Sequence, residues 1–303
     1  MNRKDALLAL LVVIIWGANF TVIKLGLGGV PSMLLVAIRY SLVAFPAVFI
    51  IKKPKTSWNY IIWYGLTVGV GQFSCLFYAM EIGMPAGLAS IIVQLQGFIS
   101  PFLSSIFFME KLAKKQLLGF VIAAIGLSII GYASLQGGLA SIPPLALLLT
   151  IGAPVFWSTS NIISKKASLQ ASEDGHKLDM LSMVIWSSLI PPIPMLVLSY
   201  FIDTPQAIIG SFASLSFMSI FSAIYLALAS TIFGYGVWNI LISKYPLSKV
   251  APTSLLVPVF GLLVSQLVLK EYLSTAQWLG VIIILLGLIV SNVTIKKEVK
   301  NGI

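Results

Sequence analysis

Charged residues are scarce in this sequence. Asp, Glu, Lys and Arg make up 9% of its 303 residues, whereas a soluble domain carries about 25%. A chain with so few charges cannot cover a water-facing surface. Lipid must therefore be the solvent for much of the protein.

Residues that usually carry catalysis or hold metal ions are also few. Cysteine occurs once, as Cys75, and histidine once, as His176. A single cysteine excludes an internal disulfide framework. The motifs H-E-x-x-H and G-x-S-x-G do not occur. We therefore expect no catalytic residue, no metal site and no cofactor, which argues against a membrane-embedded enzyme.

Long apolar segments are what the sequence has in abundance. Hydrophobic residues make up 58% of the chain, and the mean hydropathy is +1.01. Apolar runs of about 18 residues or more recur along its length, and each is long enough to cross a hydrocarbon core about 30 Å thick. Their continuity favours helices over the alternating strands of a barrel. We predict an all-α integral membrane protein with ten transmembrane helices, at residues 6–25, 31–51, 59–80, 86–108, 115–134, 144–164, 179–201, 216–240, 247–269 and 275–294.

The basic residues predict how these helices are oriented. The net charge is +10, but the charges are scattered between apolar runs, which argues against nucleic acid as a partner. With the N-terminus in the cytoplasm, sixteen Lys and Arg residues fall on the cytoplasmic side, and only Lys24 and Lys270 fall outside. This asymmetry follows the positive-inside rule. It predicts a multi-pass protein with both termini in the cytoplasm. The connections between the predicted helices are short except for one longer polar segment, for which we expect a loop at residues 165–179.

The two halves of the chain resemble each other. At an offset of 161 residues the matches are Tyr64 and Tyr225, Pro85 and Pro246, Glu110 and Glu271, Gln116 and Gln277, Gly119 and Gly280, and Gly126 and Gly287. At an offset of 141, Trp16 aligns with Trp157 and Lys24 with Lys165. Chance matching of apolar residues is the alternative, but it explains the Pro, Glu, Gln and Gly matches poorly. We predict two repeats, at residues 1–137 and 138–303. Each holds five helices, so the second is inverted.

Charged side chains are nearly absent from the middle of the predicted spans. No carboxylate lies mid-span, so no proton relay is evident. We interpret Glu81, near the outer mouth, as a solvated charge at a helix end, with a role in proton coupling as the alternative. Arg39 is the one charge well inside a span. We expect it to tie helices together, with attraction of a substrate carboxylate as the other interpretation.

Neutral polar and aromatic residues remain as candidates for a transport pathway. Several share helix faces near mid-membrane, and we predict that they bind substrate: Trp16, Asn19, Phe20, Gln72, Gln94, Trp157, Asn161, Tyr235, Trp238, Asn239 and Ser254. Gln96 is expected to face roughly away from Gln94. Amides donate to a carboxylate and accept from an ammonium, and indole rings attract cations, so the set suits a small zwitterion. The alternative is that these residues only join helices. Pro101 and Pro258 are predicted to open their helices and act structurally or in gating.

The run Trp16-Gly17-Ala18-Asn19-Phe20, together with Arg39, the run 85–90 and Glu110, resembles the EamA family of the drug/metabolite transporter superfamily. Residues 84–90, 234–238 and 251–258 look most like family members that export O-acetylserine and cysteine. The resemblance implies ten helices in two inverted repeats, a bacterial inner membrane, and alternating-access efflux of small polar metabolites by a monomer or loose dimer. A drug or other metabolite exporter, an ion channel and a non-transporting scaffold remain as alternatives.

Overall fold

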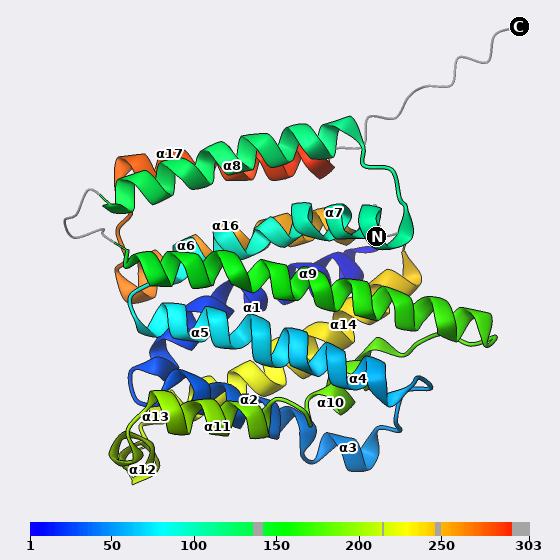
Figure 1. Cartoon of the computed structure of the whole chain (residues 1–303), viewed down its shortest axis with the longest axis horizontal. Helices are drawn as coiled ribbons and strands as arrows, with labels where there is room; N and C mark the ends of the chain where they lie inside the picture. Colours follow the sequence, from blue (N-terminus) through cyan, green and yellow to red (C-terminus); the bar gives the residue numbers. More distant parts are fainter. Residues whose placement is uncertain (136–141, 214, 246–249, 293–303) are drawn as a thin grey trace, which may run out of the picture.

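A computed structural model describes residues 1–135, 142–213, 215–245 and 250–292. Within these ranges the structure does not describe the side chains of residues 134, 135, 239, 242, 243, 251, 252, 255 and 292. Every regular element of the described chain is helical. The helices lie alongside one another and run across the view of Figure 1, with the N-terminus at the right.

The first half of the chain contains one long helix, three interrupted ones and a further long one. They are α1 (Arg3–Leu27), α2 (Ser32–Ala44) with α3 (Ala47–Ile50), α4 (Trp58–Tyr64) with η1 (Gly65–Gln72) and α5 (Phe73–Glu81), α6 (Ala86–Ile92) with η2 (Val93–Leu95) and α7 (Gln96–Phe108), and α8 (Lys114–Leu135).

The second half follows a similar order. It contains α9 (Pro144–Glu173), α10 (Met180–Ser187) with α11 (Pro192–Ile202), the short α12 (Pro205–Ala213), α13 (Phe217–Ile224) with η3 (Tyr225–Phe233) and α14 (Gly234–Lys244), η4 (Ala251–Leu256) with α16 (Val257–Leu269), and α17 (Thr275–Asn292). Helix α12 lies between the predicted spans 179–201 and 216–240 and was not expected from the sequence.

Much of the described chain is long and apolar enough to cross a membrane. Seven helical segments meet this condition, and α10 with α11, bent by 41° at their junction, would make an eighth. The apolar helices Val257–Leu269 and Thr275–Ser291 are shorter. The protein is therefore all-helical in its described part and of the membrane-spanning kind.

The predicted loop at residues 165–179 is wrong in its first half. Helix α9 continues to Glu173 before the chain turns at Gly175, whose φ is +77°. The segment between Lys165 and Glu173 contains Ala, Leu, Gln, Lys and two Ser residues but no Gly or Pro, so nothing in it stops a helix. Polarity alone suggested a loop, whereas the first residue suited to a left-handed turn is Gly175.

Local backbone features recur at a spacing of 161 residues. A π-helical segment ends at Gln72 in one half and at Phe233 in the other. Met109 and Lys270 both have positive φ values at helix ends, of 55° and 53°. The next helices then start alike, with Gln116 Oε1 accepting from Ala113 N at 2.8 Å and Gln277 Oε1 accepting from Ser274 N at 2.9 Å.

Helices α8 and α17 lie side by side along one edge of the bundle (Figure 1). A Cβ added to Gly126 would lie 2.6 Å from the carbonyl oxygen of Gly280, and a Cβ added to Gly119 would lie 2.5 Å from that of Gly287. These backbones can approach so closely only because the residues are glycines. The cavity described below lies among the other helices.

Candidate functional site

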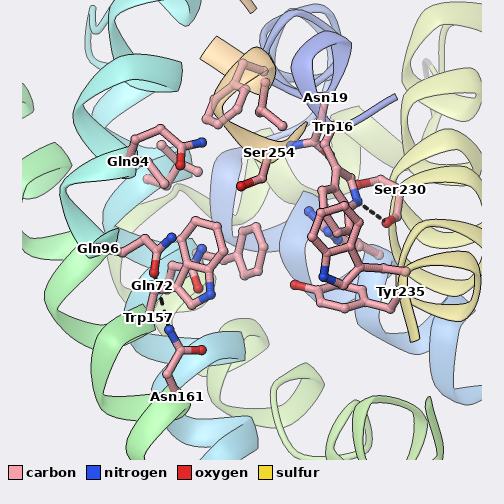
Figure 2. Close-up of a pocket in the computed structure, with 17 residues that line it drawn as sticks. Trp16, Asn19, Gln72, Gln94, Gln96, Trp157, Asn161, Ser230, Tyr235 and Ser254 are labelled. Carbon is pink, nitrogen blue, oxygen red and sulfur yellow. Dashed lines mark hydrogen bonds between the residues drawn. The ribbon is translucent and has the colours of Figure 1, made fainter. Parts of the chain in front are cut away.

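A cavity of about 290 Å³ lies inside the bundle, between α1, α2, η1, α5, η2, α7, α9, η3, α14, η4 and α16. Its walls include ten of the eleven residues predicted to bind substrate: Trp16, Asn19, Phe20, Gln72, Gln94, Trp157, Asn161, Tyr235, Trp238 and Ser254. Figure 2 shows Gln72, Gln94, Gln96, Trp157 and Asn161 on one side of the hollow, across from Trp16, Asn19, Ser230 and Tyr235. The structure thus brings these residues together around one space.

An aromatic cluster forms one wall. The Trp16 ring lies 5.6 Å from that of Tyr235 and 5.2 Å from that of Trp238, measured between centroids. Trp16 Nε1 donates to the Ser230 carbonyl at 3.0 Å (Figure 2). A Cβ at Gly234 would lie 2.5 Å from Trp16 Nε1, so a glycine is needed for the indole to sit here. The wall offers aromatic faces held at fixed angles.

An amide cluster forms the opposite wall. Asn161 Nδ2 donates to Gln96 Oε1 at 3.3 Å and to Ser100 Oγ at 3.0 Å. The expectation that Gln96 faces away from Gln94 is wrong, because both line the cavity. The cause is the 3₁₀ segment η2 at Val93–Leu95. Side chains two residues apart, such as Gln94 and Gln96, are related by a rotation about the helix axis of about 240° in a 3₁₀ helix and about 200° in an α-helix. The 3₁₀ segment therefore makes the angle between the two amides smaller than an α-helix would.

Several buried polar atoms of the cavity walls have no partner. Asn19, Arg39 and Gln72 are 8%, 3% and 5% exposed. Asn19 Oδ1, Gln72 Oε1, and Nε and Nη1 of Arg39 make no hydrogen bond among the described residues. Buried polar groups are nearly always paired. A set of unpaired ones around a single cavity indicates a polar ligand or water there.

The cavity is closed at the end toward which α1 runs. Gly17 and Gly261 bring α1, α6 and α16 into close contact, and a Cβ at Gly261 would lie 2.4 Å from Ser90 Oγ. Farther along, the Glu271 carboxylate accepts from Ala86 N at 2.9 Å and Gly87 N at 3.1 Å, which caps the N-terminus of α6. A carboxylate at a helix N-terminus satisfies free N–H groups and the helix dipole.

Exposure increases toward the other end of the cavity. The lining residues Trp157 and Asn161 on α9, and Trp238 on α14, are partly exposed. They lie on the parts of these helices that continue to Lys165 and Lys244. The cavity therefore opens at the end where those lysines lie. At that end the Lys165–Glu110 ion pair, at 2.5 Å, has side chains 36% and 53% exposed. Exposed pairs of this kind hold elements together only weakly.

The remaining predicted residues lie elsewhere or outside the described part. The Asn239 side chain lies outside the described part. Pro101 lies inside α7 and Pro258 in the first turn of α16, and neither lines the cavity. The Ser254 carbonyl, four residues before Pro258, accepts from Val257 N in a 3₁₀ turn. Five further residues line the cavity and were not expected from the sequence: Phe73, Leu76, Val93, Ser230 and Val257. The apolar ones carry no signal in sequence.

Charge is nearly absent from the cavity. Among the described lining residues, Arg39 is the one that carries charge. No group of three or more His, Cys, Asp or Glu side chains among the described residues could hold a metal ion.

Known proteins resemble this chain along its whole length. Residues 3–132 and 144–293 each match the EamA-like transporter family. A protein of Escherichia coli (strain K12) named "Probable amino-acid metabolite efflux pump" is 42% identical over 304 residues, covering 100% of both chains. A protein of the same name from Salmonella typhimurium is 42% identical, covering 96% of this chain and 95% of its own. A crystal structure at 15% identity covers 96% of this chain and 98% of its own with a TM-score of 0.62, which is a likeness of fold.

Proposed function

This chain belongs to the EamA-like transporter family, and we propose that it exports small amino-acid-like metabolites, such as O-acetylserine or cysteine, through the central cavity. The observation that carries the proposal is the amide- and aromatic-lined cavity inside a bundle of apolar helices. The names of the two relatives at 42% identity, which describe amino-acid metabolite efflux, support it.

We infer an architecture of ten transmembrane helices in two inverted repeats, at residues 1–137 and 138–303. The two family matches, at residues 3–132 and 144–293, support two similar halves. The π-helical segments, the positive-φ residues Met109 and Lys270, and the caps by Gln116 and Gln277 support the same pairing, since all recur at one spacing. Five helices in each half would make the second half upside down.

Alternating access follows from this architecture. The cavity opens at the end of the bundle that carries Lys165 and Lys244, which positive charge assigns to the cytoplasm. In our proposal the present conformation loads substrate from the cytoplasm of a bacterium, across its inner membrane. Exchange of the two repeats' conformations would then close this end and open the Glu271 end.

The chemistry of the walls suits a small zwitterion. Aromatic faces of Trp16, Trp157 and Tyr235 attract an ammonium group, and the amides of Asn19, Gln72 and Gln94 both donate and accept hydrogen bonds. A volume of about 290 Å³ suits a solute of amino-acid size with some water. The substrate is therefore expected to be small and polar rather than a large hydrophobic drug.

Flux measurements test the proposal. The purified protein in proteoliposomes should transport radiolabelled O-acetylserine or cysteine, and a panel of amino acids, nucleobases and drugs should define the substrate range. Flux that persists with an ionophore indicates facilitated transport, whereas loss of flux indicates coupling to an ion gradient. Flux of a drug with none of any amino acid would favour the alternative exporter class. Absence of all flux would favour a non-transporting scaffold.

Matched variants test the pathway. Asn19→Ala, Gln94→Ala and Trp238→Ala should each reduce flux at least about tenfold while membrane insertion stays intact, because each removes a polar or aromatic side chain that lines the cavity. The controls make the same substitutions at exposed positions outside it: Asn59→Ala, Gln206→Ala and Trp63→Ala. Equal flux in both sets would mean that the solute does not pass through this cavity.

A further inference from the structure

Arg39 is a buried cation in the cavity wall. It lies in the middle of α2 and is 3% exposed. Its Nη2 donates to Thr231 Oγ1 at 3.0 Å, and its guanidinium lies 4.3 Å from the centre of the Phe73 ring. The Thr231 hydroxyl donates in turn to the Leu226 carbonyl at 2.8 Å, within the π-helical segment η3. One hydrogen bond and one aromatic face thus fix the position of the guanidinium.

The guanidinium has no anionic partner among the described residues. The ion pairs Lys165–Glu110 and Lys244–Asp5 do not include Arg39. Its Nε and Nη1 are buried without a hydrogen-bond acceptor. An isolated buried charge is strongly unfavourable unless it is paired. Arg39 cannot lose its proton to escape this cost, so the site is incomplete without an anion.

A water molecule would answer only part of this deficit. A space of about 10 Å³ lies beside Arg39, lined by Tyr40, Tyr64 and Thr231 among others, and is just large enough for a single water. Such a water could accept from one free N–H group, but it would not neutralise the charge. The larger cavity, which Arg39 also lines, has room for an anion.

The same cavity presents unpaired acceptors. Asn19 Oδ1 and Gln72 Oε1 are buried and lack donors among the described residues. Unpaired donors on a cation and unpaired acceptors on two amides are what a carboxylate and an ammonium would satisfy. The ligand that completes this cavity therefore carries both groups.

We propose that Arg39 receives the carboxylate of the transported solute, while Asn19 and Gln72 accept from its ammonium group. This rests on the proposed function and narrows it to α-amino acids and their zwitterionic derivatives. The carboxylate of a bound zwitterion pairs with Arg39, and the net charge of the cavity does not change, whereas an amine without a carboxylate adds a second positive charge. Amines and amino-acid amides should therefore be rejected.

Competition by a series of related solutes tests this. Proteoliposomes are loaded with O-acetylserine, and counterflow of the radiolabelled compound is measured against cysteine, cysteinamide and cysteamine in the presence of a reductant. Cysteine should compete about 10- to 100-fold better than the other two, as expected for loss of one hydrogen-bonded charge contact. Equal competition by all three would overturn the assignment of Arg39 and leave the proposed function intact. Absence of any O-acetylserine counterflow would overturn both.

Variants place the discrimination at Arg39. Arg39→Gln should bring the ratio between cysteine and cysteinamide close to one, and Arg39→Lys should retain part of it. Lys24→Gln is the matched control, because Lys24 is a cation of the neighbouring helix α1 that does not line the cavity. It should keep the full ratio. If Arg39→Gln does not fold, Arg39→Lys and the solute series on the unaltered protein decide. A ratio that stays unchanged in every folded Arg39 variant would contradict the proposal.

Discussion

Replacing Glu271 with Gln is expected to open the closed end of the cavity. In this conformation the carboxylate of Glu271, at the end of α16, accepts two backbone hydrogen bonds from the start of α6. Lys24 interacts electrostatically with the same carboxylate from α1. The side chain thus connects the end of α16 to α6 by hydrogen bonds and to α1 electrostatically.

The size of the effect follows from those two bonds. A hydrogen bond to a charged group contributes about 1.5–3 kcal/mol, and one between neutral groups about 1 kcal/mol. Gln keeps one oxygen acceptor, so one bond to Ala86 N or Gly87 N is lost and the other becomes neutral. We expect this conformation to lose about 2 kcal/mol relative to one in which the cap is broken, a shift of roughly 30-fold in population.

Thiol labelling measures that shift. Leu76 lines the cavity and is 2% exposed, so Leu76→Cys reports access to its deep end. Cys75, the single native cysteine, is replaced by Ser in all variants. A membrane-impermeant maleimide is applied from the Glu271 side. Labelling should be roughly 30-fold faster when Glu271→Gln is added, because the population open to that side increases by this factor.

Glu110→Gln is the matched control, since Glu110 occupies the corresponding place in the first half. Its carboxylate pairs with Lys165 at an exposed position and caps no described helix. It should not accelerate labelling from the Glu271 side. Labelling in Glu271→Gln within twofold of the parent, in a protein that melts normally, would refute the reasoning that the cap holds this end closed.

Two stability predictions concern close contacts. Gly126→Ala should lower the melting temperature in detergent, because its Cβ would lie 2.6 Å from the Gly280 carbonyl oxygen, and overpacking costs about 1–3 kcal/mol. Gly131→Ala is the control, since it gains the same helix propensity and its Cβ would lie 3.6 Å from a Leu147 methyl group, so it should be neutral or stabilising. Equal melting temperatures of the two variants would contradict this. Trp16→Phe should lower the free energy of unfolding by about 1 kcal/mol and reduce flux, since it keeps an aromatic ring but removes the hydrogen bond to the Ser230 carbonyl. An unchanged melting temperature and unchanged flux would show that the bond has no role.

The family and the helical membrane character could be predicted because they depend on local pattern. Apolar runs define helices of either half. The run Trp16–Phe20, together with Arg39, the run 85–90 and Glu110, identified the EamA family, which the family matches over residues 3–132 and 144–293 confirm. The cavity-lining set was also largely predictable. Polar residues such as Gln94 and Asn161 are costly in lipid, so they tend to gather on faces turned toward other helices.

Three features needed the structure. The rotation that brings Gln96 beside Gln94 depends on a 3₁₀ segment, and no residue in Val93–Leu95 requires one. The extension of α9 to Glu173 depends on where the chain finds a turn, not on polarity. The unpaired state of Arg39 is a tertiary property, because the absence of a partner can be judged only when every neighbouring helix is in place.

We expect this cavity to bind an amino-acid-like solute and to face one side of the membrane at a time. Ser254→Cys, in a protein whose Cys75 is replaced by Ser, tests it most directly, because Ser254 lines the cavity and is partly exposed toward the open end. We expect a maleimide to label it from the Lys165 side and saturating O-acetylserine to slow that labelling at least about tenfold. Labelling that O-acetylserine does not slow, in a variant that still transports it, would contradict the account.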